Sequence, residues 1–261
     1  MKNWLYIVLG IVIVTITALL LGFTARQQKK VICQKVEVRI LNSRYNKFLE
    51  NKDVLDIIDD HGIKTKGEPL ESINTLLIER LLQHSPVVRS VAAYTIINGQ
   101  LIIEVEQRMP IVRIIDRSLQ QYFIDEEGVV LPDRIKQIAH VLVANGNIPP
   151  IAVKPGQKIV KTSIDSVRKS AVLQNVFLVA AFIAQDDFWK AQVEQIYVND
   201  NGDMLLVPRI GDHVIVFGDA SDLREKFVKL KSMYYAFNQI GWNHYKVLNL
   251  KYKNQIVCIK R

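Results

Sequence analysis

The N-terminal part of the chain carries one long apolar segment. Residues 3–25, NWLYIVLGIVIVTITALLLGFTA, include no charged residue. As a helix of about 1.5 Å per residue, this segment reaches roughly 34 Å, enough to cross a bilayer core of about 30 Å. Trp4 and Tyr6 lie at one end of the segment, where they suit the aromatic belt of a membrane interface. The pattern predicts an uncleaved membrane helix.

A cleaved signal peptide is the alternative for this segment. The apolar run exceeds the usual signal-peptide core of about 7–15 residues, and Phe23 disrupts a small-x-small cleavage site that would end at Ala25. The flanking charges favour a cytoplasmic location for the rest of the chain, because basic residues tend to stay on the cytoplasmic side. Lys2 alone precedes the run, and three basic residues follow it by position 30. Charge alone therefore does not fix the orientation of the chain.

Residues 31–110 predict a strand and two helices, followed by a hairpin. VEVRI at 36–40 alternates as a strand does. Asn51 offers a cap for a first helix, which buries the stripe Val54, Ile57 and Ile58 and ends at Gly62. A second helix stops before Pro86 and is expected to bury Ile73, Leu76, Leu77 and Leu81.

The hairpin of this region comes directly after the second helix. VVRSVAAYTI and LIIEVEQR are apolar runs on either side of the turn dipeptide Asn98-Gly99. The predicted order of the region is strand, helix, helix, strand, strand.

Residues 111–261 alternate strands with two long helices. YFIDEEGVVLP at 122–132 predicts a hairpin that turns at Gly128. Ser163 can cap a helix that runs to about Ala184. The next helical stripe comprises Leu223, Phe227, Leu230, Tyr234 and Phe237, and we expect Arg224, Lys226, Lys229 and Lys231 to lie off it.

The last residues predict two closing strands. Residues 247–253 alternate apolar and polar, Lys253-Asn254-Gln255 can turn, and residues 256–259 form a second short apolar run. That run is apolar on both of its faces, while Lys253, Lys260 and Arg261 flank it with charges that discourage indiscriminate edge pairing. We therefore expect an exposed edge strand at this end.

Composition narrows the class of protein. The chain of 261 residues is 49% hydrophobic, so it can bury a core, and its net charge of +8 is scattered without a block of five like charges. We expect no nucleic-acid binding. Cys33 and Cys258 stand far apart, and they imply neither a disulfide framework nor a zinc site.

The sequence carries no local catalytic signature. Its five histidines are dispersed, and the Gly-x-Ser-x-Gly elbow, the P-loop and the dinucleotide fingerprint are absent. Asp59-Asp60 fits a solvated helix end, and Asp125-Glu126-Glu127 fits a hairpin turn. We expect a protein without enzymatic activity, cofactor or metal.

Several motifs together resemble one family. SPVVRSVAAYTIINGQLIIEVEQRMPIVRI at 85–114 is similar to a POTRA domain, and Glu-Gln-Arg-Met-Pro-Ile at 106–111 resembles the exit of that domain. The hairpin at 122–132, the stretch IGDHVIVFGDASDLREKFVKLKSMY and the closing VLNLKY resemble the second domain of the bacterial cell-division proteins FtsQ and DivIB. Asn249 and Lys251 stand where that family usually has Asp and Arg.

The resemblance implies an α+β fold in three parts. Residues 1–30 would hold a short tail, the transmembrane helix at 3–25 and a basic neck, residues 31–110 a POTRA domain (β-α-α-β-β), and residues 111–261 a mixed β domain with flanking helices and an exposed edge strand. Such proteins span the inner membrane once, with the N-terminus cytoplasmic and the domains periplasmic at the division septum. They bind FtsB-like and FtsL-like membrane coiled-coil proteins and influence septal peptidoglycan synthesis.

The resemblance also suggests where partners bind. A partner strand adding to the last strands would contact Tyr252 above all, with Lys251 meeting a carboxylate; the full predicted set is Lys251, Tyr252, Asn254, Ile256, Val257 and Ile259. An alternative for Tyr252 is a side chain half buried on a helix of its own domain. Recruitment by other division proteins through the POTRA domain is predicted at Val87, Val88, Val91, Arg108 and Pro110.

Two other functions remain open from the sequence. A membrane-anchored periplasmic hydrolase would need a cleft with converging polar groups. A POTRA protein of outer-membrane assembly would need a C-terminal barrel, for which the long helices leave little chain.

Overall fold

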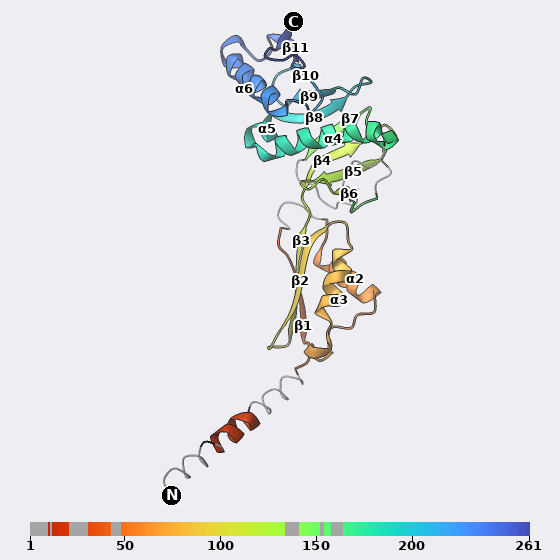
Figure 1. Ribbon diagram of the computed structural model, residues 1–261, viewed down its shortest axis with the longest axis vertical. Helices are drawn as coiled ribbons and strands as arrows, with labels where there is room; N and C mark the ends of the chain where they lie inside the picture. The colour runs from red at the N-terminus through yellow and green to blue at the C-terminus, as the bar shows by residue number, and fades with distance from the viewer. Residues whose placement is uncertain are drawn as a thin grey trace. The chain divides into compact units, whose positions relative to one another are not determined.

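The computed structural model describes Gly10 and residues 12–20, 31–42, 48–133, 141–151, 154–157 and 164–261. These residues divide into two compact units (Figure 1), of which the first comprises Met1–Ser43 with Leu49–Gln107 and the second Arg44–Phe48 with Arg108–Arg261. Each unit contains its own β-sheet. The units are therefore described separately.

The described part of the predicted membrane segment is helical. Gly10 and residues 12–20 have helical geometry. The hydroxyls of Thr15 and Thr17 donate to the carbonyls of Val12 and Ile13 within this helix, at 2.9 Å each, which satisfies both polar side chains locally. Over the residues that the structure describes, no helix has both the length and the hydropathy to cross a bilayer. Residues 3–9, 11 and 21–25 lie outside that part, so the helix over 3–25 stays a prediction.

The first unit has the predicted order of elements. Its sheet runs β1-β3-β2, with β1 parallel and β2 antiparallel to the central β3. The elements are β1 (Lys35–Ile40), α2 (Asn51–Asp60), the 3-10 helix η1 (Leu70–Ser72), α3 (Thr75–Gln83), β2 (Val88–Ile96) and β3 (Gln100–Gln107). A three-residue loop ending at Gly99, whose φ of +85° suits glycine, joins β2 to β3.

Helix α2 begins one residue earlier than predicted, because Asn51, the expected cap, is its first residue. Glu50 is the N-cap, and its backbone N–H donates to the Asp53 carboxylate at 2.7 Å. The helix buries Val54 and Ile58, so the predicted stripe is confirmed at these two positions.

The stripe predicted for α3 is wrong at Leu76 and Leu77, while Ile73, just before the helix, is buried as predicted. The helix buries Ile78 and Leu82, whereas Leu76 and Leu77 are exposed. Apolar residues occupy more than one face of this short helix, so periodicity alone does not select the buried one. Asn74 caps the helix by accepting the backbone N–H of Leu77.

Side chains of α3 occupy the outer edge of β2. The carboxylate of Glu79 accepts the backbone N–H of Ala93 at 2.8 Å, and the amide of Gln83 donates to the carbonyl of Arg89 at 3.1 Å. These bonds use backbone groups that an added strand would need.

The second unit contains a mixed sheet of nine strands. Their order is β12-β11-β10-β9-β8-β7-β4-β5-β6, so β12 and β6 are the two ends. The strands are β4 (Pro110–Ile115), β5 (Gln121–Asp125), β6 (Val130–Pro132), β7 (Leu142–Gly146), β8 (Val193–Val198), β9 (Met204–Pro208), β10 (Val214–Gly218), β11 (Tyr245–Asn249) and β12 (Val257–Lys260). The helices are α4 (Ile164–Gln185), α5 (Asp187–Gln192) and α6 (Leu223–Ile240).

Three helices and the sheet share one core. Residues of α4, α5 and α6 join the sheet in a single apolar cluster, and Figure 1 shows α4 crossing the strands. The predicted stripe of α6 is confirmed at Phe227, Leu230, Tyr234 and Phe237, which are buried. Ser163, the predicted cap of α4, lies outside the described residues.

Lys226 is buried, contrary to the prediction that it avoids the apolar side of α6. Its ammonium group lies over the ring of Phe217. The same group donates to the backbone carbonyl and the carboxylate of Asp219, at 2.9 and 3.0 Å. The long aliphatic stem therefore packs in the core while its charge is paired at the rim.

The hairpin predicted at Gly128 forms between β5 and β6. One carboxylate oxygen of Asp125 accepts the backbone N–H groups of Glu127 and Val129, at 2.9 and 2.7 Å. Asp125 is buried and pairs with Arg108 at 2.7 Å. The acidic cluster is thus part of a structural turn.

Candidate partner-binding edge

Strand β12 is an open end of the nine-stranded sheet. It pairs antiparallel with β11, and the described residues place no strand on its other side. Ile256 and Cys258 pack against the core, whereas Val257 and Ile259 are exposed. The two faces therefore alternate, although all four side chains are apolar.

The other end of this sheet is covered by the chain itself. On β6, the backbone N–H of Val130 donates to the carbonyl of Gln157 at 3.1 Å, and its carbonyl accepts the N–H of Gly156 at 2.7 Å. Because these groups are used, β6 does not offer the free row of donors and acceptors that strand addition requires. The two ends of the sheet thus differ.

Strand β11 ends earlier than predicted. It stops at Asn249, not at Lys253, because the Asn249 side chain accepts the backbone N–H of Lys251 at 3.0 Å and turns the chain. Asn254 has a positive φ of 58°, which completes the reversal toward β12. Tyr252 and Asn254 consequently lie in a loop between the two strands and not on a strand.

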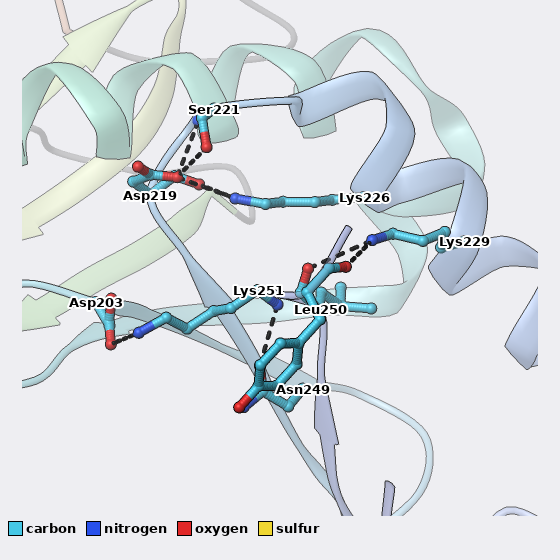
Figure 2. Close-up of polar contacts among 9 residues, drawn as sticks. Asp203, Asp219, Ser221, Lys226, Lys229, Asn249, Leu250 and Lys251 are labelled. Carbon is cyan, nitrogen blue, oxygen red and sulfur yellow. Dashed lines mark hydrogen bonds and ion pairs between the residues drawn. The ribbon is translucent and has the colours of Figure 1, made fainter. Parts of the chain in front are cut away.

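Lys229 of α6 fixes the loop from the other side. Its ammonium group donates to the carbonyl of Tyr252 at 2.7 Å and reaches the carbonyl of Leu250 at 3.5 Å (Figure 2). Leu250 is fully buried, while the Tyr252 side chain is exposed. The backbone around Tyr252 is therefore held while the residue is about half exposed to solvent. A role of its ring in partner binding, and the alternative of a ring half buried on a helix, both stay predictions.

Lys251 already has a carboxylate partner within the chain. Its ammonium group contacts the Asp203 carboxylate at 2.7 Å (Figure 2), and this hydrogen bond raises the pKa of Lys251. A Cβ atom on Gly218 would lie 3.0 Å from Cγ of Lys251, so the lysine stem passes close over a glycine. Whether Lys251 also meets a carboxylate of a partner stays a prediction.

The turn before α6 is set by Asp219. A hydrogen bond from Ser221, aided by Lys226, lowers the pKa of Asp219 to about 2 (Figure 2). The ionised carboxylate accepts the backbone N–H of Ser221 at 3.1 Å. It thereby fixes the start of the helix that supplies Lys229.

The far end of β12 is tied to the β9–β10 loop. Arg261 donates to both the carboxylate and the backbone carbonyl of Asp212, and this contact lowers the pKa of that carboxyl. The neighbouring His213 is buried against the rings of Tyr234 and Phe237. Burial lowers the pKa of His213, against an opposing contribution from the Trp242 carbonyl.

We expect the second unit to lose stability as the pH falls below the ordinary histidine pKa of about 6.5. Because burial lowers the pKa of His213 in the folded state, the unfolded chain binds a proton at this residue more readily. The stabilisation is complete at neutral pH and is lost as the pH falls from about 6.5 toward the lower pKa of the folded state. One such proton changes the free energy of unfolding by at most about 1.4 kcal/mol per pH unit. Urea unfolding between pH 7.5 and 5.5 measures it, and an equal slope in a His213→Gln variant would contradict the assignment.

Three of the five residues predicted for recruitment are buried within their own unit. Val87 and Val88 are buried in the first unit, and Val91 is half-buried. Arg108 belongs to the second unit, where it pairs with Asp125 and Glu127. Pro110 begins β4 and is buried. Burial leaves Val87, Val88 and Pro110 without a side chain to offer a partner.

Sequence reasoning missed the residues that position the loop. Asp203, Gly218, Lys229 and Asn249 were assigned no part in it, although an asparagine two residues before Lys251 is a recognisable signal for a side-chain turn. The others lie far from Tyr252 in sequence, and only the fold brings them near.

A cavity of about 560 Å³ lies in the second unit. Its charged lining residues are Glu126, Lys190, Glu194 and Arg209, and its lining includes no serine, threonine, cysteine or histidine. Among the residues that the structure describes, no group of three or more His, Cys, Asp or Glu side chains could hold a metal ion. The described lining of this cavity therefore offers no hydroxyl or thiol nucleophile.

The fold and the comparisons define a mixed α+β protein in which a POTRA-like domain precedes a domain built on a large β-sheet. Residues 31–106 match the family model of the POTRA-like domain, and residues 109–259 match the model described as FtsQ/DivIB, C-terminal related. The chain belongs to this FtsQ/DivIB family, so the resemblance seen in the sequence is confirmed. No curated protein matches the chain.

Proposed function

We propose that this chain is a non-enzymatic, membrane-anchored scaffold of the bacterial division complex, which binds FtsB-like and FtsL-like proteins through its second unit. Membership of the FtsQ/DivIB family supports a division-related role. The observation that supports binding at one place is the difference between the two ends of the sheet. β6 is covered by residues 156 and 157, and β12 is open.

Binding proceeds by strand addition to β12. A partner segment gains main-chain hydrogen bonds from the free edge, and its alternate side chains lie beside Val257 and Ile259 or over the partly buried Ile256 and Cys258. Tyr252 lies in the loop that leads from β11 into this edge strand, and the loop is held by Lys229 and Asn249. A partly exposed tyrosine on a loop whose backbone is held offers the kind of aromatic contact that is enriched in hot spots.

The proposed topology rests on the uncharged segment 3–25. This segment anchors the chain in the inner membrane with the N-terminus in the cytoplasm and both units in the periplasm, at the septum. Other division proteins recruit or are recruited through the first unit, and the assembly influences when septal peptidoglycan synthesis begins. The basic residues after the segment oppose this orientation, so topology needs its own measurement.

The test of the role is a depletion and topology experiment in the native cell. We expect depletion to give filamentous cells and a C-terminal reporter that functions only outside the cytoplasm to be active. Normal division after depletion, or a reporter that behaves as cytoplasmic, would contradict the proposal.

Proline substitution separates edge pairing from folding. Consecutive N–H groups of an antiparallel strand point to opposite sides, so one of Val257→Pro and Cys258→Pro removes a donor to β11 and the other removes a donor on the open side. We expect the variant that lacks the donor on the open side to bind the FtsB-like protein about fivefold more weakly, the equivalent of one hydrogen bond. Its thermal stability should change little. The controls are Val257→Thr and Cys258→Ala. Unchanged affinity in both proline variants argues against strand addition.

A further inference from the structure

Three segments meet at one end of the first unit, which we call the entry end: residues 31–34, 64–70 and 96–99. The backbone N–H of Gln34 donates to the carbonyl of Gly99 at 2.8 Å, and that of Leu70 donates to the carbonyl of Val31 at 2.9 Å. In Figure 1 the tip of the β2–β3 hairpin and η1 lie at this same end of the unit. Backbone hydrogen bonds thus join the three segments of the entry end into one surface.

The entry end exposes aliphatic side chains where polar ones are usual. Ile97, in the loop of the β2–β3 hairpin, is 72% exposed, and Ile32 is 50% exposed. Loop positions of hairpins normally carry Gly, Asn, Asp or Ser. Ile96 and Pro69 are exposed beside them. A single exposed isoleucine means little, but several on one small end of a domain form an apolar patch.

Lysines flank this apolar patch. Lys64 and Lys66 are exposed, and over the described residues neither has an ion-pair partner. Lys35 pairs with Glu37 at 3.0 Å. Carboxylates are also near, at Glu68 and Glu71 in the same loop and in η1. Apolar side chains flanked by basic ones are the pattern of surfaces that lie in a membrane interface.

The length of chain fixes how far this end can be from the uncharged segment. Ala25 ends the segment and Val31 is already bonded into the entry end. Six peptide steps reach at most about 20 Å even when fully extended. If residues 3–25 lie in a bilayer, the entry end is held near its surface, and a weak contact suffices because the tether supplies a high effective concentration.

We propose that the entry end is a membrane-contacting surface, in which Ile97 and Ile32 enter the headgroup region of the bilayer and Lys64 and Lys66 lie against anionic headgroups. This inference rests on the proposed anchoring of residues 3–25. Its consequence is that the first unit is held at the bilayer by two points, the anchor and the hairpin tip, and does not rotate freely on its neck.

The test uses the full chain in vesicles of phosphatidylethanolamine and phosphatidylglycerol, part of whose lipids carry a headgroup quencher. A Cys258→Ser background leaves only the buried Cys33, and a fluorophore is attached at Asn98→Cys, beside Ile97. The comparison probe is at His84→Cys, since Ser85 bonds to Val88 at the other end of β2. The nine residues of β2 span about 26 Å.

We expect strong quenching of the probe at residue 98 and little at residue 84. Adding Ile97→Ser is expected to lower the ratio of docked to undocked hairpin tips about tenfold. Leu77→Ser, at an exposed position of α3, is expected to leave the quenching unchanged. Flotation of the vesicles separates the hypothesis of a membrane anchor at residues 3–25 from that of a membrane contact at the entry end. A chain that floats but shows equal quenching at both probes, or no effect of Ile97→Ser, overturns the contact alone, while a chain that fails to float overturns the anchor and the contact together.

Discussion

Replacing Tyr252 by alanine is expected to weaken binding of the FtsB-like partner by about 2 kcal/mol or more, roughly 30-fold, as for an interface hot spot. The side chain is 49% exposed and its loop is held through backbone groups, by Lys229 and Asn249. Truncation of the ring therefore removes contact surface without removing the bonds that shape the loop. The free energy of unfolding should change by no more than about 0.5 kcal/mol.

A matched tyrosine controls for this result. Tyr235 lies on α6 of the same unit and is 65% exposed. We expect Tyr235→Ala to leave both affinity and stability unchanged, and Tyr252→Phe to retain most of the binding. Affinity is measured with the full chain in nanodiscs and the membrane-embedded partner. Equal losses of affinity in the two alanine variants would refute a specific role for Tyr252.

Replacing Phe227 by alanine is expected to lower the free energy of unfolding of the second unit by about 3–5 kcal/mol. Phe227 is buried, stacks on Phe182 at a centroid distance of 4.4 Å, and contacts Trp189 at 4.9 Å and Phe217 at 5.1 Å. The ring thus joins α6 to α4, α5 and β10. Its loss opens a cavity that rigid neighbours from two other helices and a strand fill only partly.

Tryptophan fluorescence during urea unfolding measures this loss. Trp189 and Trp242 both lie in the second unit, and Trp4 is the third tryptophan of the chain. Tyr235→Ala is again the control, with an expected change within about 0.5 kcal/mol. A loss below about 1 kcal/mol for Phe227→Ala would mean that the core repacks and that the ring does not hold the helices together.

The elements that the sequence predicted well depend on local patterns. Asn98-Gly99 and Gly128 mark hairpins because turn chemistry is decided within a few residues. The stripe of α6 recurs over an 18-residue helix, so its period is unambiguous. The shorter α3, with leucine or isoleucine on more than one face, gave the wrong buried side.

The candidate site was predicted only in part, because its geometry depends on distant residues. The edge at β12 was expected, but the strand before it ends at Asn249, where a side chain competes with the backbone ladder. Lys251 meets Asp203, and Lys229 reaches the carbonyl of Tyr252, across separations that no local pattern encodes. In the nine-stranded sheet most strands lie beside their neighbours in sequence, as is usual. The exception is β7, which pairs with β4 and not with β6, and no local pattern encodes this crossover.

Closure of β6 by residues 156 and 157, with β12 left open, also affects the order in which a complex can grow. A strand that adds to β12 takes over the position of last strand, and its own outer backbone groups then face solvent. Binding by this route transfers the open edge to the newcomer and does not abolish it. Under the proposed function, a second partner strand adds to the edge that the first partner strand exposes. Partner strands therefore join the sheet one after another, at one end only.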